Sequence, residues 1–310
     1  MNTQPIRPVT ELTQAGYGQQ QKRKSMSYTH VTAPTQYVEA GGVRHAYRRF
    51  GKTGNAPPLV FCVHFRGAMD NWDPAVTDGL AANREVILFD YAGVAGSEGQ
   101  VPQAFEDFGD DTASVIRALG IEKADILGLS IGGYVAQEVA LRHPELVRRL
   151  VLTGTGPRAG EFEDRDPMVN QVAAHPEISM EDILFLFFGP SESSRQAGKE
   201  SWARRHQRTV DFEKEAGLDV AKAQGAAMQA YLEPVGERWS YLKTIQQPTL
   251  IVNGSRDILI PTINSYTLQQ HIPGAQLIIY PDSGHGALFQ YPELFVSHVS
   301  RFLDTPTAFT

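Results

Sequence analysis

The chain has 310 residues, of which 42% are hydrophobic and 20% are charged, as is ordinary for a globular enzyme. Its formal net charge of −7 argues against binding to nucleic acids or anionic membranes, because both require a basic surface. No apolar run approaches the roughly 20 residues of a membrane span, and we expect no secretory signal, because no apolar run lies near the first residue. The single cysteine, Cys62, rules out an intramolecular disulfide and lies in an apolar run, so we expect a buried thiol and a cytoplasmic location.

The first 34 residues are rich in Gln, Thr, Ser and Pro, a composition that predicts a flexible tail. Two strand-like runs around Gly41-Gly42 then predict a β-hairpin. Further strand-like runs follow at 58–64, 84–89, 124–129, 148–153, 248–253 and 275–280. Several are continuously apolar, which is typical of parallel strands covered on both faces. Helical patterns between them, at 104–119, 132–142, 262–271 and 292–303, predict an α/β fold with a doubly wound, mostly parallel sheet.

The long interval between the strand runs ending at 153 and beginning at 248 interrupts this alternation. A structureless loop of that length is implausible inside a compact domain. The interval contains helical stretches at 180–188, 194–208 and 218–232. We therefore predict a helical lid over 157–243, inserted into a core made of 35–156 and 244–310.

Residues 128–132 match the pattern G-x-S-x-G, with Ser130 at its centre. The motif follows a strand run and precedes a helix, which is the context of a nucleophile elbow. At such a turn the residues two before and two after the serine approach closely, so Gly128 and Gly132 are the residues that fit. The amide of Ile131, at the start of the helix, is then expected to stabilise an oxyanion.

A nucleophilic serine needs a base, and His285 is the best placed of nine histidines. It lies in a turn-rich loop after the strand run at 275–280, at the edge of a parallel sheet where ligands bind. Asp257 follows the strand run at 248–253 and is expected to orient the imidazole. The strand run at 148–153, which precedes it, is followed by no acidic residue before Glu161. Asp282 lies too close to His285 in sequence to be the first choice, but it could support the site through a second hydrogen bond.

Taken together, these residues resemble the α/β-hydrolase superfamily from about residue 37 to residue 304. Ser130, Asp257 and His285 occur in the family's order, and residues 90–97 resemble its Asp-x-x-Gly-x-Gly-x-Ser loop with a shift of one position. The match is nearest to the branch of esterases, cofactor-free haloperoxidases and carbon–carbon hydrolases. A serine nucleophile argues against epoxide hydrolases and haloalkane dehalogenases, which resemble this fold but use aspartate.

In the family, the loop after the strand run at 58–64 supplies the other backbone amide that binds the oxyanion. Here this loop departs from the family's His-Gly-x-x pattern, because residues 64–67 read His-Phe-Arg-Gly. Alignment on Gly67 and Trp72 makes the Phe65 amide the second oxyanion donor, whereas alignment on His64 selects Arg66. We favour Phe65. The Arg66 side chain is then either solvated or a contact for a substrate carboxylate.

The resulting hypothesis is a serine hydrolase that cleaves an ester, thioester or lactone of a small to medium apolar substrate through an acyl-enzyme. Carbon–carbon bond hydrolysis or perhydrolysis by the same triad, or a slow-turnover receptor, are the alternatives. We expect Arg66, Phe188, Trp202 and Trp239 at the substrate pocket. The sequence carries no metal-binding or phosphate-binding motif, so we expect no cofactor, no metal, a small-molecule partner, and a monomer or homodimer.

Overall fold

The computed structural model describes residues 28–163 and 165–306, so the tail expected over 1–34 lies mostly outside the described residues. The described chain forms one eight-stranded sheet in the order β1-β2-β4-β3-β5-β6-β7-β8. The strands are β1 (Gln36–Ala40), β2 (Val43–Gly51), β3 (Leu59–Cys62), β4 (Glu85–Phe89), β5 (Ala124–Leu129), β6 (Val147–Thr153), β7 (Thr249–Gly254) and β8 (Gln276–Tyr280). The β1–β2 and β2–β4 pairs are antiparallel and the other pairs are parallel, which confirms the predicted sheet.

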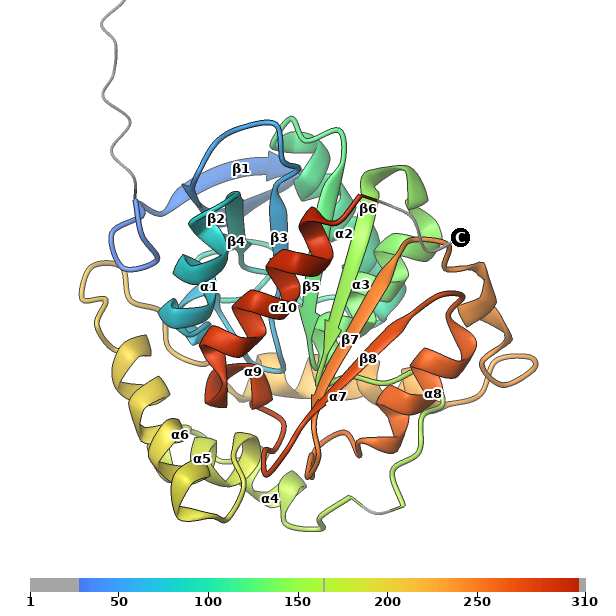
Figure 1. The fold of residues 1–310 in the computed structure, drawn as a ribbon. Helices are drawn as coiled ribbons and strands as arrows, with labels where there is room; N and C mark the ends of the chain where they lie inside the picture. Colours follow the sequence, from blue (N-terminus) through green and yellow to red (C-terminus); the bar gives the residue numbers. More distant parts are fainter. Residues whose placement is uncertain (1–27, 164, 307–310) are drawn as a thin grey trace, which may run out of the picture.

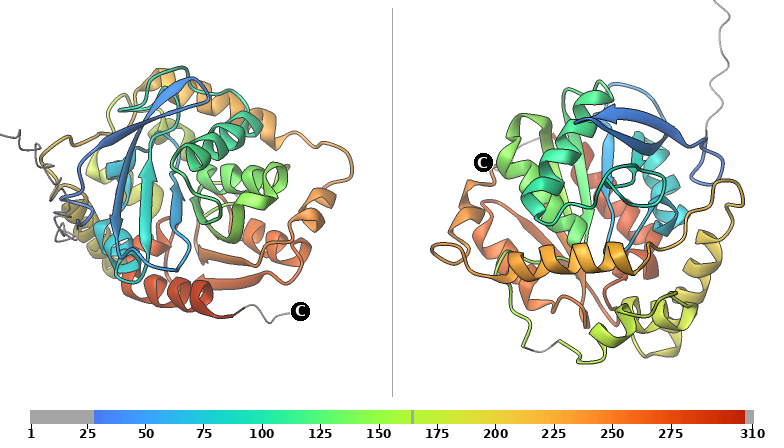
Figure 2. Two further views of the ribbon diagram at one scale, coloured as in Figure 1. Left: turned by 90° about the horizontal axis from the view of Figure 1, so that it is seen from above. Right: turned by 180° about the vertical axis from the view of Figure 1, so that it is seen from behind.

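Helices cover both faces of this sheet (Figure 1). On one face α1 (Pro74–Ala81) packs against α10 (Pro292–Asp304), and on the other α2 (Phe105–Ala118) packs against α3 (Ile131–Arg142). Figure 2 shows the two layers from above in its left panel. Short helices α8 (Ile263–His271) and α9 (Ala287–Gln290) follow β7 and β8. The sequence pattern did not predict α1 or α9.

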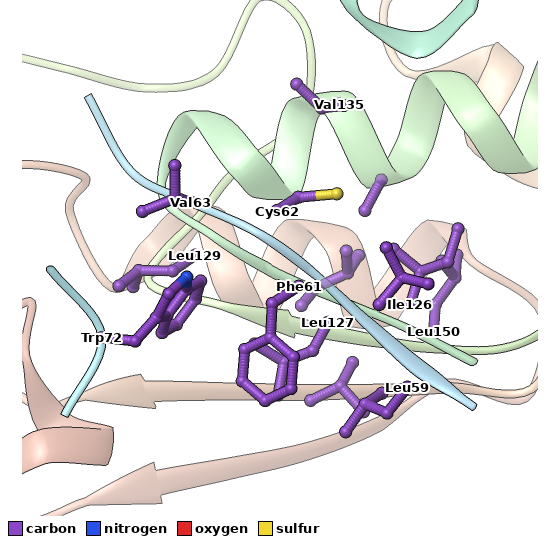
Figure 3. Close-up of a cluster of buried hydrophobic side chains, with 14 of the residues drawn as sticks. Leu59, Phe61, Cys62, Val63, Trp72, Ile126, Leu127, Leu129, Val135 and Leu150 are labelled. Atoms are coloured by element: carbon purple, nitrogen blue, oxygen red, sulfur yellow. The ribbon is translucent and has the colours of Figure 1, made fainter. Parts of the chain in front are cut away.

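The centre of the sheet is buried on both faces, which explains the continuous apolar runs. All four residues of β3 are buried. In Figure 3, Cys62 lies on the side of β3 that faces α3, whereas Phe61 lies on the opposite side near Trp72. The rings of Phe61 and Trp72 meet edge to face, with centroids 4.9 Å apart. Because successive side chains of a strand point to opposite faces, both faces here require apolar residues.

Between β6 and β7 the chain leaves the sheet and forms α4 (Val169–Ala173), α5 (Met180–Phe187), α6 (Glu192–Arg205) and α7 (Leu218–Leu232). These helices lie beyond the carboxyl ends of the parallel strands, and the right panel of Figure 2 shows α7 crossing below α2 and α3. We call this insertion the lid. Its three longer helices match the predicted helical stretches, and the single turn of α4 was not predicted.

Residues 28–34 do not behave as the loose tail that the composition suggested. His30 and Ala33 are fully buried. The backbone N–H of His30 donates to Asp78 Oδ1 at 2.7 Å. Arg208, which follows α6, donates to the backbone carbonyls of Val31 at 2.9 Å and Ala33 at 2.8 Å. Polar composition failed as a guide here because the segment is fixed by hydrogen bonds to the core and lid.

We predict that Arg208→Met lowers the free energy of unfolding by about 2–4 kcal/mol, because several buried carbonyls lose their donor. Urea denaturation followed by circular dichroism measures this change. Arg195→Met is the matched control, since the Arg195–Glu181 pair is exposed and its loss is expected to cost less than about 1 kcal/mol. Equal stabilities of the two variants would contradict the docking role of Arg208.

Candidate active site

Ser130 occupies the sharp turn between β5 and α3. Its backbone angles, φ 60° and ψ −123°, lie in a region that L-residues seldom adopt. The turn is possible because its neighbours lack side chains. A methyl group on Gly128 would collide with the carbonyl of Gly132, and one on Gly132 would collide with the carbonyl of Cys62 in β3. The two glycines therefore have the close-packing role that the sequence predicted for them.

Asp257 and His285 are brought together from the loops after β7 and β8. The Nδ1 atom of His285 lies 2.8 Å from Oδ2 of Asp257, and both side chains are buried. The other carboxylate oxygen accepts the backbone amides of Leu259 at 2.9 Å and Ile260 at 3.0 Å, which fix the carboxylate. With Nδ1 donating to this carboxylate, the neutral imidazole presents Nε2 as an acceptor. The buried Nε2 has no hydrogen-bond partner among the described residues.

Two adjoining cavities meet at Ser130. The larger, of about 560 Å³, is lined mainly by apolar side chains of the lid and core. The smaller, of about 50 Å³, is lined by both Ser130 and His285. Phe65, Ala173 and Leu259 border both cavities, so the serine lies where the two spaces join.

A second histidine, His64, also lines the smaller cavity. Burial, assisted by the nearby charge of Arg205, lowers the pKa of His64 to about 4. Its Nδ1 lies 2.9 Å from the carbonyl oxygen of Phe65. His64 is therefore neutral near pH 7, and of the two histidines that line this cavity it is His285 whose Nδ1 contacts a carboxylate.

The hydrogen bonds of the loop at residues 64–67 determine which of its backbone amides are free to bind an oxyanion. The N–H of Arg66 donates to Oε1 of Gln224, on α7, at 2.8 Å. The Phe65 N–H forms no hydrogen bond with a described residue, and Ile131 is the first residue of α3, where amides lack intrahelical partners. This geometry favours Phe65 over Arg66 as the partner of Ile131.

The Arg66 side chain is not solvated, since the residue is only 2% exposed. Its guanidinium donates to backbone carbonyls of the lid: Ala216 at 2.6 Å, His175 at 2.7 Å, Pro176 at 3.0 Å and Ala173 at 3.1 Å. Arg66 also borders the smaller cavity. Its hydrogen bonds nevertheless make it a tie between the core and the lid, a role that the sequence did not suggest.

The three aromatic residues expected at the pocket line neither cavity at Ser130. Phe188 packs against Gly198 of α6. The ring of Trp202 packs against that of His206 at a tilt of 33°, with centroids 4.3 Å apart. Trp239 donates through Nε1 to the carbonyl of Ala159. The larger cavity is lined instead by positions of both core and lid, among them Phe65, Tyr134, Phe162, Arg165, Met228 and Leu259. No sequence motif distinguishes the lid positions of this set.

Asp282, the alternative partner of His285, is directed to the lid. Its carboxylate accepts a hydrogen bond from the hydroxyl of Ser191 at 2.6 Å.

Within residues 28–163 and 165–306, no group of three or more His, Cys, Asp or Glu side chains is placed to hold a metal ion. No helix in the same ranges is long and apolar enough to cross a membrane.

Comparison with known proteins links this architecture to a family. The family model for the alpha/beta hydrolase fold matches residues 57–292. An alpha/beta hydrolase fold protein from Chitinophaga pinensis, of known structure, is 37% identical and aligns over 90% of this chain and 100% of its own, with a TM-score of 0.83.

Two further relatives have named activities. The 2-hydroxymuconate semialdehyde hydrolase of Pseudomonas sp. (strain CF600) is 29% identical over 275 residues, covering 86% of this chain and 92% of the relative. The solved structure of Est816, described as an N-acyl homoserine lactone degrading enzyme, is 25% identical. That alignment covers 86% of this chain and 100% of Est816, with a TM-score of 0.66.

We predict that Gly132→Ala lowers the free energy of unfolding by about 3 kcal/mol or more, because the added methyl group meets backbone that cannot move aside. Thermal and urea denaturation measure the effect. Gly225→Ala in α7 is the matched control, since a methyl group there has open space and alanine favours a helix. A Gly132→Ala protein as stable as the control would refute the close approach of α3 to β3.

Proposed function

Because the chain belongs to the α/β-hydrolase family and is a hydrolase, we propose that it is a serine hydrolase acting on an ester, thioester or lactone through an acyl-enzyme on Ser130. One observation carries this proposal. The strained turn brings Ser130 to a cavity shared with His285, whose Nδ1 contacts Asp257 and whose Nε2 forms no hydrogen bond with a described residue, Ser130 included.

In this mechanism the Oγ of Ser130 attacks the substrate carbonyl and His285 Nε2 takes the hydroxyl proton. The carboxylate of Asp257 stabilises the imidazolium, and the amides of Phe65 and Ile131 stabilise the oxyanion. His285 then protonates the departing oxygen, and the carbon–oxygen bond breaks to leave the acyl-enzyme. A water molecule, deprotonated by His285, then attacks the acyl carbonyl. The bond between the acyl carbon and Oγ breaks, His285 returns the proton to Ser130, and the acid leaves.

The two cavities suggest where each half of the substrate binds. The departing group must reach His285, which borders only the smaller of the two spaces. A volume of about 50 Å³ is enough for the hydrolytic water or a small alcohol, since a water molecule occupies about 30 Å³ in the liquid. The acyl group then occupies the larger cavity, whose apolar walls suit a chain of carbon atoms.

Carbon–carbon bond hydrolysis is the second candidate, because the relative at 29% identity is named as a 2-hydroxymuconate semialdehyde hydrolase. The similarity to Est816, which is described as an N-acyl homoserine lactone degrading enzyme, favours a lactone as the substrate. Perhydrolysis by the same triad stays a further alternative, since fold and triad do not separate these reactions. A panel of small esters, lactones and vinylogous diketones compares the candidates directly.

We expect Ser130→Ala to lower kcat for a small methyl ester by about 10⁴-fold or more, and Asp257→Asn by about 10³–10⁴-fold. The physical reasons are the loss of the nucleophile and of the carboxylate that fixes the imidazole tautomer. Methanol release measures both. Ser114→Ala is the control, since that hydroxyl bonds within its own helix, remote from the cavities. Full activity in Ser130→Ala would refute the proposal.

We also expect Gln224→Leu to lower kcat about tenfold, because the Arg66 amide loses its acceptor and the oxyanion loop loses its support. Steady-state kinetics should show the effect in kcat more than in KM. Gln224→Glu retains an acceptor oxygen and is expected to recover most of the activity. If the Gln224→Leu and Gln224→Glu proteins have equal kcat, the hydrogen bond from the Arg66 amide to residue 224 does not position the loop.

A further inference from the structure

The larger cavity has an unbalanced charge. Its lining includes two cationic side chains, Arg165 and Lys222, and no carboxylate among the described residues. Lys222 is exposed, so solvent screens its charge. Arg165 is partly buried, and this burial lowers the pKa of its guanidinium. The cavity is thus mostly apolar, with one partly desolvated cation in its lining.

Arg165 differs from the buried arginines in having no hydrogen-bond or ion-pair partner for its side chain among the described residues. Arg48 forms two hydrogen bonds with Asp70, Arg66 binds four lid carbonyls, and Arg84 binds Asp304. The Nε of Arg165 is buried without a hydrogen-bond partner, and its guanidinium forms no ion pair with a described residue. A buried N–H without an acceptor is costly, and the Arg165 side chain, unlike those of the three arginines above, has no other hydrogen bond among the described residues to offset this cost.

The charges around Arg165 do not supply that acceptor. Tyr134 and Asp257 are the described groups near enough to raise its pKa electrostatically. Burial raises the pKa of Tyr134, so its hydroxyl stays neutral. Both carboxylate oxygens of Asp257 are engaged, by His285 and by two backbone amides. Among the described residues Arg165 thus has no acceptor, and a carboxylate on a molecule in the cavity would supply one.

We infer that the acyl part of the substrate carries a carboxylate, which Arg165 binds inside the larger cavity while the scissile carbonyl lies at Ser130. This inference rests on the proposed function, and it narrows the substrate from an uncharged ester to a half-ester or lactone of a dicarboxylic acid. The planar fork of a guanidinium matches two carboxylate oxygens, and the apolar walls strengthen the pairing by excluding water.

The test compares monomethyl esters of straight-chain dicarboxylic acids with the dimethyl esters of the same acids. The two series share the leaving group and chain length and differ in the remote charge. We expect the wild-type protein to prefer the monoanion for at least one chain length. In Arg165→Met, kcat/KM for the monoanion should fall about 10–100-fold, so that the preference disappears.

Two matched variants separate this effect from a general loss of positive charge. Arg301→Met removes an exposed arginine from α10 and should preserve the wild-type preference. Lys222→Met removes the cation at the exposed side of the cavity and should reduce the preference less than Arg165→Met does. Arg165→Met should melt no lower than the wild-type protein, because it removes a desolvated cation that has no described partner.

Several outcomes would overturn the inference. These are a wild-type preference for the diesters at every chain length, an equal loss on both series in Arg165→Met, or a lowered melting temperature that accounts for the lost activity. If the wild-type protein cleaves neither series, the proposed function fails while the inference stays testable by calorimetry. Monomethyl esters should then bind the Ser130→Ala protein and lose affinity when Arg165→Met is added, and absent binding would refute the carboxylate site.

Discussion

The close approach of three backbone segments beneath Ser130 is the constraint on which the rest of the site depends. The carbonyl of Cys62 in β3 lies where any side chain at position 132 would be, and position 128 is closed in the same way by Gly132. This packing forces the serine into a strained conformation with positive φ that the sheet and α3 must hold in place. A looser packing of α3 would relax the turn and move both the hydroxyl and the Ile131 amide.

The lid is bound to the core by directed polar contacts as well as by apolar packing. Arg66 binds four carbonyls of the lid, and Gln224 of α7 holds the amide of Arg66. In α6, Arg204 forms two hydrogen bonds with the buried Asp73, at 2.8 and 2.6 Å. The oxyanion loop and the lid are therefore positioned together, and a shift of the lid is expected to alter the loop.

The core of this fold could be predicted from the sequence because its signals are local. Apolar runs located the eight strands within one or two residues, and the glycines around Ser130 identified the turn. His285 and Asp257 followed from their positions after strands, since parallel strands bring their ends to one edge. The structure places these two side chains in contact.

The lining of the cavities could not be predicted in the same way. Trp202 and Trp239 were chosen as large aromatic residues of the lid, but composition does not determine which face of an irregular insertion meets the serine. Arg165 lies in no recognisable sequence motif. Its assignment as a ligand-binding residue depends on its position in the cavity lining and on the absence of a partner for its Nε among the described residues. The docking of His30 likewise depends on contacts with residues distant in sequence, which a local polar composition does not reveal.

The burial of Cys62 has a consequence for experiments on this protein. Its thiol is fully enclosed between β3 and α3, and burial raises its pKa to about 12. Because thiolates, not thiols, react with alkylating reagents, the only native cysteine stays inert under ordinary labelling conditions. A cysteine introduced on the exposed surface of α6 or α7 would then accept a fluorophore or spin label selectively, and lid movement could be followed without first removing the native sulfur.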